Sequence, residues 1–277
     1  LMAPAMFGVS VSQINLLLDT VLASLLQTGS VTWLYYSDRL VELPLGVFAI
    51  AIGTVILPSL SGKHAGDDPQ AFSRTLDWAL KLVLLIGVPA ALALAVIAEP
   101  LLATLFNHGE FGANDVLRSA ESLRAYSAGL VAFMLIKILA PGYFARQDTR
   151  TPVKIGIIAM VANMALNLAL IWPLQHAGLA LATSLSAWLN AGLLYIGLRR
   201  GGVYRPMKGW WQHGLRLALA GGAMAGAIYW LARQATVWLN GALWDRILWL
   251  GLIVVAGLAV YLLALLILGL RPRHLRR

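Results

Sequence analysis

The stretch LYYSDRLVELP (residues 34–44) places Asp38, Arg39 and Glu42 directly before the apolar run LGVFAIAIGTVILPSL. The charge-free part of this region, residues 43–57, would be roughly 22 Å long as an α-helix, which is shorter than the roughly 30 Å hydrocarbon core of a bilayer. A helix that crosses a membrane here must therefore extend back through Glu42 and Arg39. The sequence thus predicts charged side chains inside a membrane-spanning helix.

The composition is that of a membrane protein. The chain has 277 residues, 60% hydrophobic and 12% charged, with a mean hydropathy of +0.77. A soluble domain of this size could not bury so much apolar surface. Cysteine is absent and the five histidines show no metal-ligand spacing. The net charge of +9 is dispersed between apolar blocks, which is typical of membrane topology and does not indicate a nucleic-acid partner.

The apolar blocks predict an all-α polytopic membrane protein. Their lengths suit helices and exceed the roughly 10 residues of a barrel strand, and they do not alternate. We expect residues 1–200 to form one domain of six transmembrane helices, and residues 201–277 to form a C-terminal helix pair with a basic tail. The chain starts at Leu1 as though cut from a longer one. The eight predicted helices are residues 6–26, 33–57, 78–97, 123–144, 153–171, 179–198, 215–232 and 247–268.

The connections between these helices alternate in positive charge. Fifteen of the 21 Lys and Arg residues lie in or beside the connections that follow the second, fourth, sixth and eighth predicted helices. Four lie in or beside the other connections: Arg118, Arg124, Arg233 and Arg246. Because cytoplasmic loops carry the excess of Lys and Arg, the first set is predicted to be cytoplasmic, together with the C-terminus. The two remaining basic residues, Arg39 and Lys137, lie well inside predicted helices.

Arg39 and Glu42 share a helix face at a spacing of i, i+3 and can pair. A charge at the bilayer centre costs about 2.5–3.5 kcal/mol, so such residues usually face a water-filled cavity. Arg39 could line a cavity or reach the outer headgroups, and Lys137 could line the same cavity or reach the cytoplasmic surface. Pro44 can loosen the helix beyond this pair.

Polar side chains also occur near the middle of three predicted helices: Asp19, then Asn163 and Asn167 at i, i+4, and Thr183. Together they offer the hard oxygen ligands that a small alkali cation prefers, so a sodium ion is a possible ligand. The alternative is hydrogen bonding between helices, worth about 0.6 kcal/mol per contact. That alternative suits the amide and hydroxyl groups better than it suits Asp19. An unpaired carboxylate at this depth must be neutral or hold a cation.

No phosphate-binding loop, nucleophile elbow or carboxylate dyad occurs in the sequence. We therefore predict that the chain is not an enzyme, and that it has no cofactor apart from the possible sodium ion.

Four motifs, in order along the first five predicted helices, resemble the MurJ (MviN) lipid II flippases of the multidrug/oligosaccharidyl-lipid/polysaccharide exporter superfamily. They are GVSVSQINLLLDTVLAS, WLYYSDRLVELPLGVFAIAIGTVILPSLS, LFNHGEFGANDV and LAPGYFARQDTRTPVKI. That family has fourteen transmembrane helices, and this chain resembles helices seven to fourteen. The resemblance implies an N-terminal lobe outside this chain and a place in the bacterial cytoplasmic (inner) membrane.

The resemblance also implies a cargo and a site. The whole protein would move lipid II, the undecaprenyl-pyrophosphate-linked peptidoglycan precursor, to the outer leaflet by alternating access. Arg39 would line the central cavity beside Glu42, with Lys137 as a further candidate for binding the headgroup. The last two helices would form a groove for the polyprenyl tail among membrane lipids. The residues Asp19, Asn163, Asn167 and Thr183 match the sodium site of some family members, although some relatives carry a second acid where this chain has Asn167.

Two other functions stay open from the sequence. One is a transporter of the same superfamily with another cargo, either a polysaccharide-lipid or a drug. The other is a non-transporting membrane scaffold, in which Asp19, Arg39 and Glu42 would be inaccessible to water. A cargo-exchange assay would distinguish a transporter of another cargo from a lipid II flippase. Labelling of a cysteine at position 39 by a membrane-impermeant reagent would indicate a water-filled cavity and would argue against a scaffold.

Overall fold

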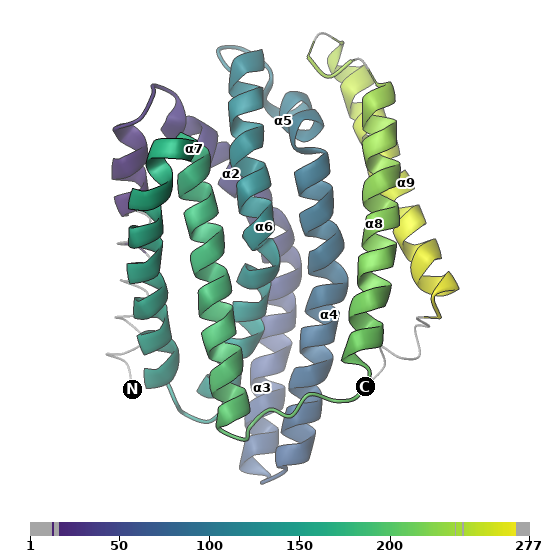
Figure 1. Ribbon diagram of the computed structural model, residues 1–277. Coiled ribbons are helices and arrows are strands. Elements are labelled where there is room, and N and C mark those ends of the chain that lie inside the picture. The colour runs from purple at the N-terminus through teal and green to yellow at the C-terminus, as the bar shows by residue number, and fades with distance from the viewer. Residues whose placement is uncertain (1–12, 14–16, 236, 240, 270–277) are drawn as a thin grey trace.

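The computed structural model describes residues 13, 17–235, 237–239 and 241–269, and these residues form helices without any strand (Figure 1). The predicted all-α membrane fold is confirmed. Residues 17–24 are the described end of the first predicted helix, most of which lies outside the described residues, as does most of the basic tail. The later helices are α2 (Ser30–Pro44), η1 (Leu45–Ile50), α3 (Ala51–Ala65), α4 (Pro69–Val96), α5 (Ala98–Phe106), α6 (Ala113–Phe144), α7 (Arg150–Arg200), α8 (Trp210–Gln234) and α9 (Leu243–Ile267).

The segments α2, η1 and α3 form one continuous stretch, Ser30–Ala65. Arg39 and Glu42 lie inside it, as the length argument predicts. The stretch changes from α-helix to π-helix directly after Pro44. Proline has no backbone N–H to donate and its ring crowds the preceding turn, so a local change of helical winding at this point is expected.

The helix α7 is a hairpin of two antiparallel limbs (Figure 1). Its backbone leaves the helical region at Gln175, where φ is 50° and ψ is −131°. Gly178 follows in close contact with the backbone of Leu170, where a Cβ atom would collide. The two limbs contain the predicted helices 153–171 and 179–198.

Six helical stretches among the described residues are long and apolar enough to cross a membrane, and the α7 hairpin is one of them. The total of eight remains a prediction, because the first helix is described only in part. The helices start earlier than predicted, most of all α4, which begins at Pro69, and α6, which begins at Ala113.

The C-terminal pair α8 and α9 packs against α4 through small residues (Figure 1). Gly221 of α8 lies against Leu92 of α4, and Gly257 of α9 lies against Ile228 of α8. Glycine permits such close approach of helices in a membrane, where packing and not hydrophobic burial drives association.

One buried carboxylate, Asp77 of α4, fixes the linker that leads into α8. Asp77 is 1% exposed and forms an ion pair with Lys81 at 2.7 Å. It also accepts hydrogen bonds from the hydroxyl of Tyr204 at 2.7 Å, from the indole of Trp210 at 2.7 Å and from the backbone N–H of Met207 at 3.1 Å. A buried charge is stable only with such partners, so these contacts fix the position of the linker against α4.

A buried arginine fixes the other end of the pair. Arg246 of α9 is 9% exposed, and its guanidinium donates to four backbone carbonyl groups. The acceptors, with their distances, are Gly241 (3.0 Å), Ala103 (3.0 Å), Leu239 (3.1 Å) and Asn107 (3.4 Å). The acceptors at Ala103 and Asn107 tie α9 to the end of α5.

Candidate functional site

Arg39 and Glu42 form an ion pair on α2, with the Arg39 Nη1 and Glu42 Oε2 atoms 2.6 Å apart. The two side chains are 54% and 51% exposed. The guanidinium also lies over the ring of Tyr35, 4.9 Å from its centroid. Because Arg39 keeps further N–H donors on an accessible face, it can bind an anion while it stays paired with Glu42.

Lys137 lies on α6 with an exposed side chain, well along the molecule from Arg39. Its backbone carbonyl lies beside Gly53 of α3. Gly53 is fourteen residues beyond Arg39, or about 21 Å along a continuous helix at 1.5 Å per residue. An anion held by Arg39 would therefore meet Lys137 only after a shift along the molecule.

Asp38, the third charge of the opening stretch, is half-buried, whereas the neighbouring Arg39 side chain is exposed. Its neighbour Ser37 is fully buried, and the Ser37 hydroxyl bonds to the carbonyl groups of Trp33 and Ser119, each at 2.7 Å. These contacts fix the rotation of α2 against α6. They thereby keep Arg39 on the accessible side.

The predicted polar residues of the other helices meet in one cluster. Asn167 donates from its amide nitrogen to Asp19 Oδ1 at 2.6 Å and to Asn163 Oδ1 at 3.1 Å. Asn163 in turn lies 3.4 Å from the hydroxyl of Thr183, and that hydroxyl lies 3.5 Å from Asp19 Oδ2. Both limbs of α7 and the first helix contribute to this cluster.

The cluster fits a small monovalent cation. Asn163 and Asn167 are each 1% exposed, and the side-chain oxygen of Asn167 has no hydrogen-bond partner. The cluster offers carboxylate, amide and hydroxyl oxygens with a single negative charge. Within the described part of the chain, no group of three or more His, Cys, Asp or Glu residues comes together. The same contacts are also those of hydrogen bonding between helices, so the sodium site remains a prediction.

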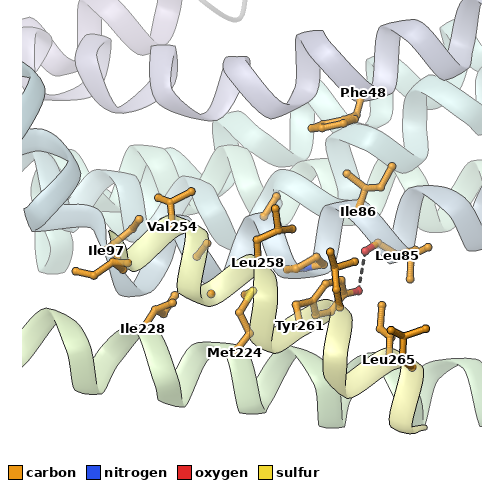
Figure 2. Close-up of a pocket in the computed structure, with 17 residues that line it drawn as sticks. Phe48, Leu85, Ile86, Ile97, Met224, Ile228, Val254, Leu258, Tyr261 and Leu265 are labelled. Carbon is orange, nitrogen blue, oxygen red and sulfur yellow. Dashed lines mark hydrogen bonds between the residues drawn. The ribbon is translucent and has the colours of Figure 1, made fainter. Parts of the chain in front are cut away.

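An apolar pocket of about 710 Å³ lies between α4, α8 and α9 (Figure 2). Tyr261 supplies a polar atom there, and its hydroxyl already donates to the carbonyl of Leu85 at 2.7 Å. Phe48 of η1 reaches the pocket from the far side, a contribution that the sequence analysis missed. The pocket can thus hold a hydrocarbon chain but offers little to a polar group. Its other labelled wall residues are Ile86, Ile97, Met224, Ile228, Val254, Leu258 and Leu265.

Comparisons with known proteins agree on one family. The model of the family "Lipid II flippase MurJ" matches residues 1–268. A probable lipid II flippase MurJ of Vibrio cholerae is 52% identical over 276 residues, covering 100% of this chain and 53% of the relative. The lipid II flippase MurJ of Burkholderia cenocepacia is 41% identical over 278 residues, covering 100% and 54%. The chain thus spans about half the length of the curated relatives it matches.

Solved structures place the fold in the same group. A structure described as lipid II flippase MurJ in an inward closed conformation superposes with a TM-score of 0.78 and 25% identity, covering 94% of this chain and 52% of that one. An outward-facing multidrug resistance MATE family transporter of the MOP superfamily superposes with a TM-score of 0.62 and 19% identity, covering 94% and 61%. The second likeness concerns the fold alone.

Proposed function

Because the chain belongs to the lipid II flippase MurJ family, a family of multi-pass proteins of the bacterial inner membrane, we propose that it is the second lobe and C-terminal helix pair of a flippase for lipid II. The cargo would pass from the inner to the outer leaflet by alternating access of two lobes. The observation that carries the proposal is the accessible Arg39–Glu42 pair inside a helix long enough to span the membrane. A lipid-facing ion pair at that place would be costly, whereas one that faces a cavity is not.

Arg39 would recognise the pyrophosphate of the cargo. Its guanidinium can give two parallel hydrogen bonds to phosphate oxygens, and Glu42 and Tyr35 hold it in place from the sides. No covalent step is needed. The protein has only to bind the headgroup, shield it from lipid and expose it on the other side.

The test is Arg39→Ala in the full-length protein, with Arg39→Lys beside it. Loss of a bidentate contact worth about 3 kcal/mol would weaken headgroup binding by roughly a hundredfold. We expect lipid II translocation to be abolished by Ala and to be partly kept by Lys, which retains the charge but not the fork geometry. Translocation is measured by the accessibility of lipid II at the outer leaflet, and membrane insertion by the protein level.

Arg124→Ala is the matched control. Arg124 also forms an exposed ion pair with a carboxylate, Glu99, at 2.6 Å, but it joins α6 to α5 and lies outside the proposed cavity. This variant should translocate normally. Normal translocation by Arg39→Ala at normal protein level would overturn the proposal.

The polyprenyl tail would lie in the apolar pocket of α4, α8 and α9. Hydrocarbon gains nothing from the hydrophobic effect on leaving a lipid phase, so the pocket would act by position and close packing. It would keep the tail beside the protein while the headgroup moves. Phe48, six residues beyond Glu42, would connect this pocket to the headgroup helix.

A photoreactive residue at Leu258, which lines the pocket, should crosslink to a polyprenyl pyrophosphate lipid in membranes. The same residue at Val255, which lies on α9 outside the pocket and is 67% exposed, is the control and should react mainly with bulk lipid. Equal crosslinking of the polyprenyl lipid at both positions would contradict the tail assignment.

A sodium ion in the Asp19 cluster would bias the lobe movement. The donor set fits, and the residues Asp19, Asn163, Asn167 and Thr183 would hold the ion. The bound ion would supply a positive charge that joins the first helix to both limbs of α7. Moving one charge through 100 mV is worth about 2.3 kcal/mol, enough to shift a two-state equilibrium by about fiftyfold.

A further inference from the structure

Four buried side-chain atoms in the described part of the chain have no hydrogen-bond partner: Ser119 Oγ, Ser122 Oγ, Asn167 Oδ1 and His176 Nδ1. Such an atom costs about 1–3 kcal/mol unless water or an ion satisfies it. All four lie on α6 or α7, which pack against each other, and none is more than 1% exposed. The four atoms therefore belong to one region of the molecule, where α6 and α7 pack together.

The four atoms are spread along one direction. His176 lies at the reversal of α7, where its Nε2 atom is 3.0 Å from the carbonyl of Arg118. About two turns further along α6, the carbonyl of Ala125 accepts a hydrogen bond from Ser184 at 2.7 Å. Thr183 of the Asp19 cluster adjoins Ser184. Seven residues of α6 therefore separate the level of His176 from the level of the cluster, or about 10 Å.

The two serines lie between these levels. Ser122 is four residues beyond Arg118 and three before Ala125, so helix geometry puts it on the stripe of α6 that faces α7. Ser119 is one turn earlier, and its backbone carbonyl faces α2 through Ser37. The unpartnered atoms thus follow the seam of α2, α6 and α7 from the reversal end towards Asn167 and Asp19.

An exposed carboxylate stands at the start of this series. Glu121 is 46% exposed, 3.5 Å from the His176 ring and 3.5 Å from Arg118. The series runs from that carboxylate through two hydroxyls to the amide oxygen of Asn167 and the carboxylate of Asp19. Apart from the ring nitrogen of His176, the ligands are oxygens, and an acid stands at each end, with Arg118 paired to the outer acid. Oxygen ligands of this kind favour a cation over an anion.

We propose that this series of polar atoms is a hydrated path, by which a small monovalent cation enters from the α7 reversal end and reaches the Asp19 cluster. The inference rests on the proposed sodium site for its end point, but the path itself is a separate claim. An ion cannot cross hydrocarbon unaided at acceptable cost, so a buried cation site needs a polar route of this kind. The positive-inside prediction puts its entrance on the outer side of the membrane.

The test uses Ag⁺, a small monovalent cation that reacts with thiols, on full-length protein whose other cysteines have been removed. Ser122→Cys is nearly isosteric, and Ser119→Cys is the second variant should the first fold poorly. We expect Ag⁺ added at the outer side to modify both. The control is Ser127→Cys, which is 2% exposed on α6 but whose serine hydroxyl is already bonded to the carbonyl of Arg124 at 2.7 Å. It should stay unmodified.

A second variant tests the entrance. Glu121→Gln removes the carboxylate with little change of shape, and it should slow Ag⁺ modification at position 122 severalfold while leaving the rate of a neutral thiol reagent unchanged. Failure of Ag⁺ to reach positions 119 and 122, while a cysteine at the exposed Leu117 reacts, would overturn the path. Modification at both positions without any effect of sodium on protein stability would support the path and count against sodium at the cluster.

Discussion

At the scale of single residues, the proposed sodium site depends most on Asn167. It sits between Asp19 and Asn163, and it uses its amide nitrogen on both, so that its oxygen is left without a partner. An acid at this position would have no N–H to donate and would add a second negative charge. The resemblance to the flippase family identifies this place as one where some relatives do carry an acid.

Asn167→Asp should strengthen sodium binding by about tenfold or more, or about 1.4 kcal/mol, because two adjacent carboxylates gain from a shared cation. The measurement is the thermal midpoint of the full-length protein in sodium chloride against the same concentration of potassium chloride. Without sodium the variant should be less stable than the parent protein, since the two carboxylates repel each other.

Asp19→Asn is the companion variant, and it removes the charge of the cluster with little change of shape. In this variant the thermal midpoint should be the same in sodium chloride as in potassium chloride. An equal sodium response in the parent protein and both variants would show that sodium acts elsewhere.

At the scale of elements, Arg246 shows what holds the C-terminal pair in place. Arg246→Met keeps the length of the side chain but removes all its donors, leaving the carbonyls of residues 239, 241, 103 and 107 without this partner. We expect a loss of about 2 kcal/mol or more in stability, seen as a lower thermal midpoint in detergent. Lipid contacts of α9 should rise as the pair loosens from α5.

Arg233→Met provides the comparison for this variant. Arg233 lies in the last turn of α8, is exposed and contacts the hydroxyl and ring of Tyr229. Its removal should change the midpoint little, because exposed contacts of this kind contribute little to stability. A similar fall for both variants would mean that the buried carbonyl contacts of Arg246 add nothing beyond the loss of a positive charge.

The elements also show how far the sequence can predict this molecule. Hydropathy and the span length predicted the helices and correctly drew Arg39 and Glu42 into one of them, because both arguments depend on neighbours in the chain. The role of Asp77 was missed, since its partner Trp210 is 133 residues away. Arg246 was counted as a loop charge, although its carbonyl partners bury it. The composition of a loop cannot reveal such contacts.

The candidate site also has parts that the sequence predicted and parts that it did not. The spacing of Asn163 and Asn167 predicted a shared face, and the structure does bring that face to Asp19 and Thr183. The sequence left open whether Lys137 joins Arg39, and the structure separates the two along the helix axis. Phe48 was not foreseen, because nothing in the run LGVFAI signals that a π-helical turn will aim a phenylalanine at α9.

At the scale of the whole molecule, the exposed face of α2 would be more stable if another part of the protein covered it. It carries Arg39, Glu42 and Tyr35, and a charged pair that faced lipid would cost several kcal/mol. The relatives are about twice as long as the matched region, so they have room for a second lobe of similar size. Two lobes that enclose the pair would turn a costly surface into a binding cavity.

We therefore expect the 277-residue chain alone to insert into the membrane but not to sustain growth of a strain depleted of its own lipid II flippase. Co-expression with the preceding half of the Vibrio cholerae relative should restore growth, because that half would supply the missing wall of the cavity. The control is the same pair with Arg39→Ala in this chain, which should assemble equally well by co-purification and yet fail to support growth. Growth on the chain alone would instead mean that one lobe, or two copies of it, suffices for translocation.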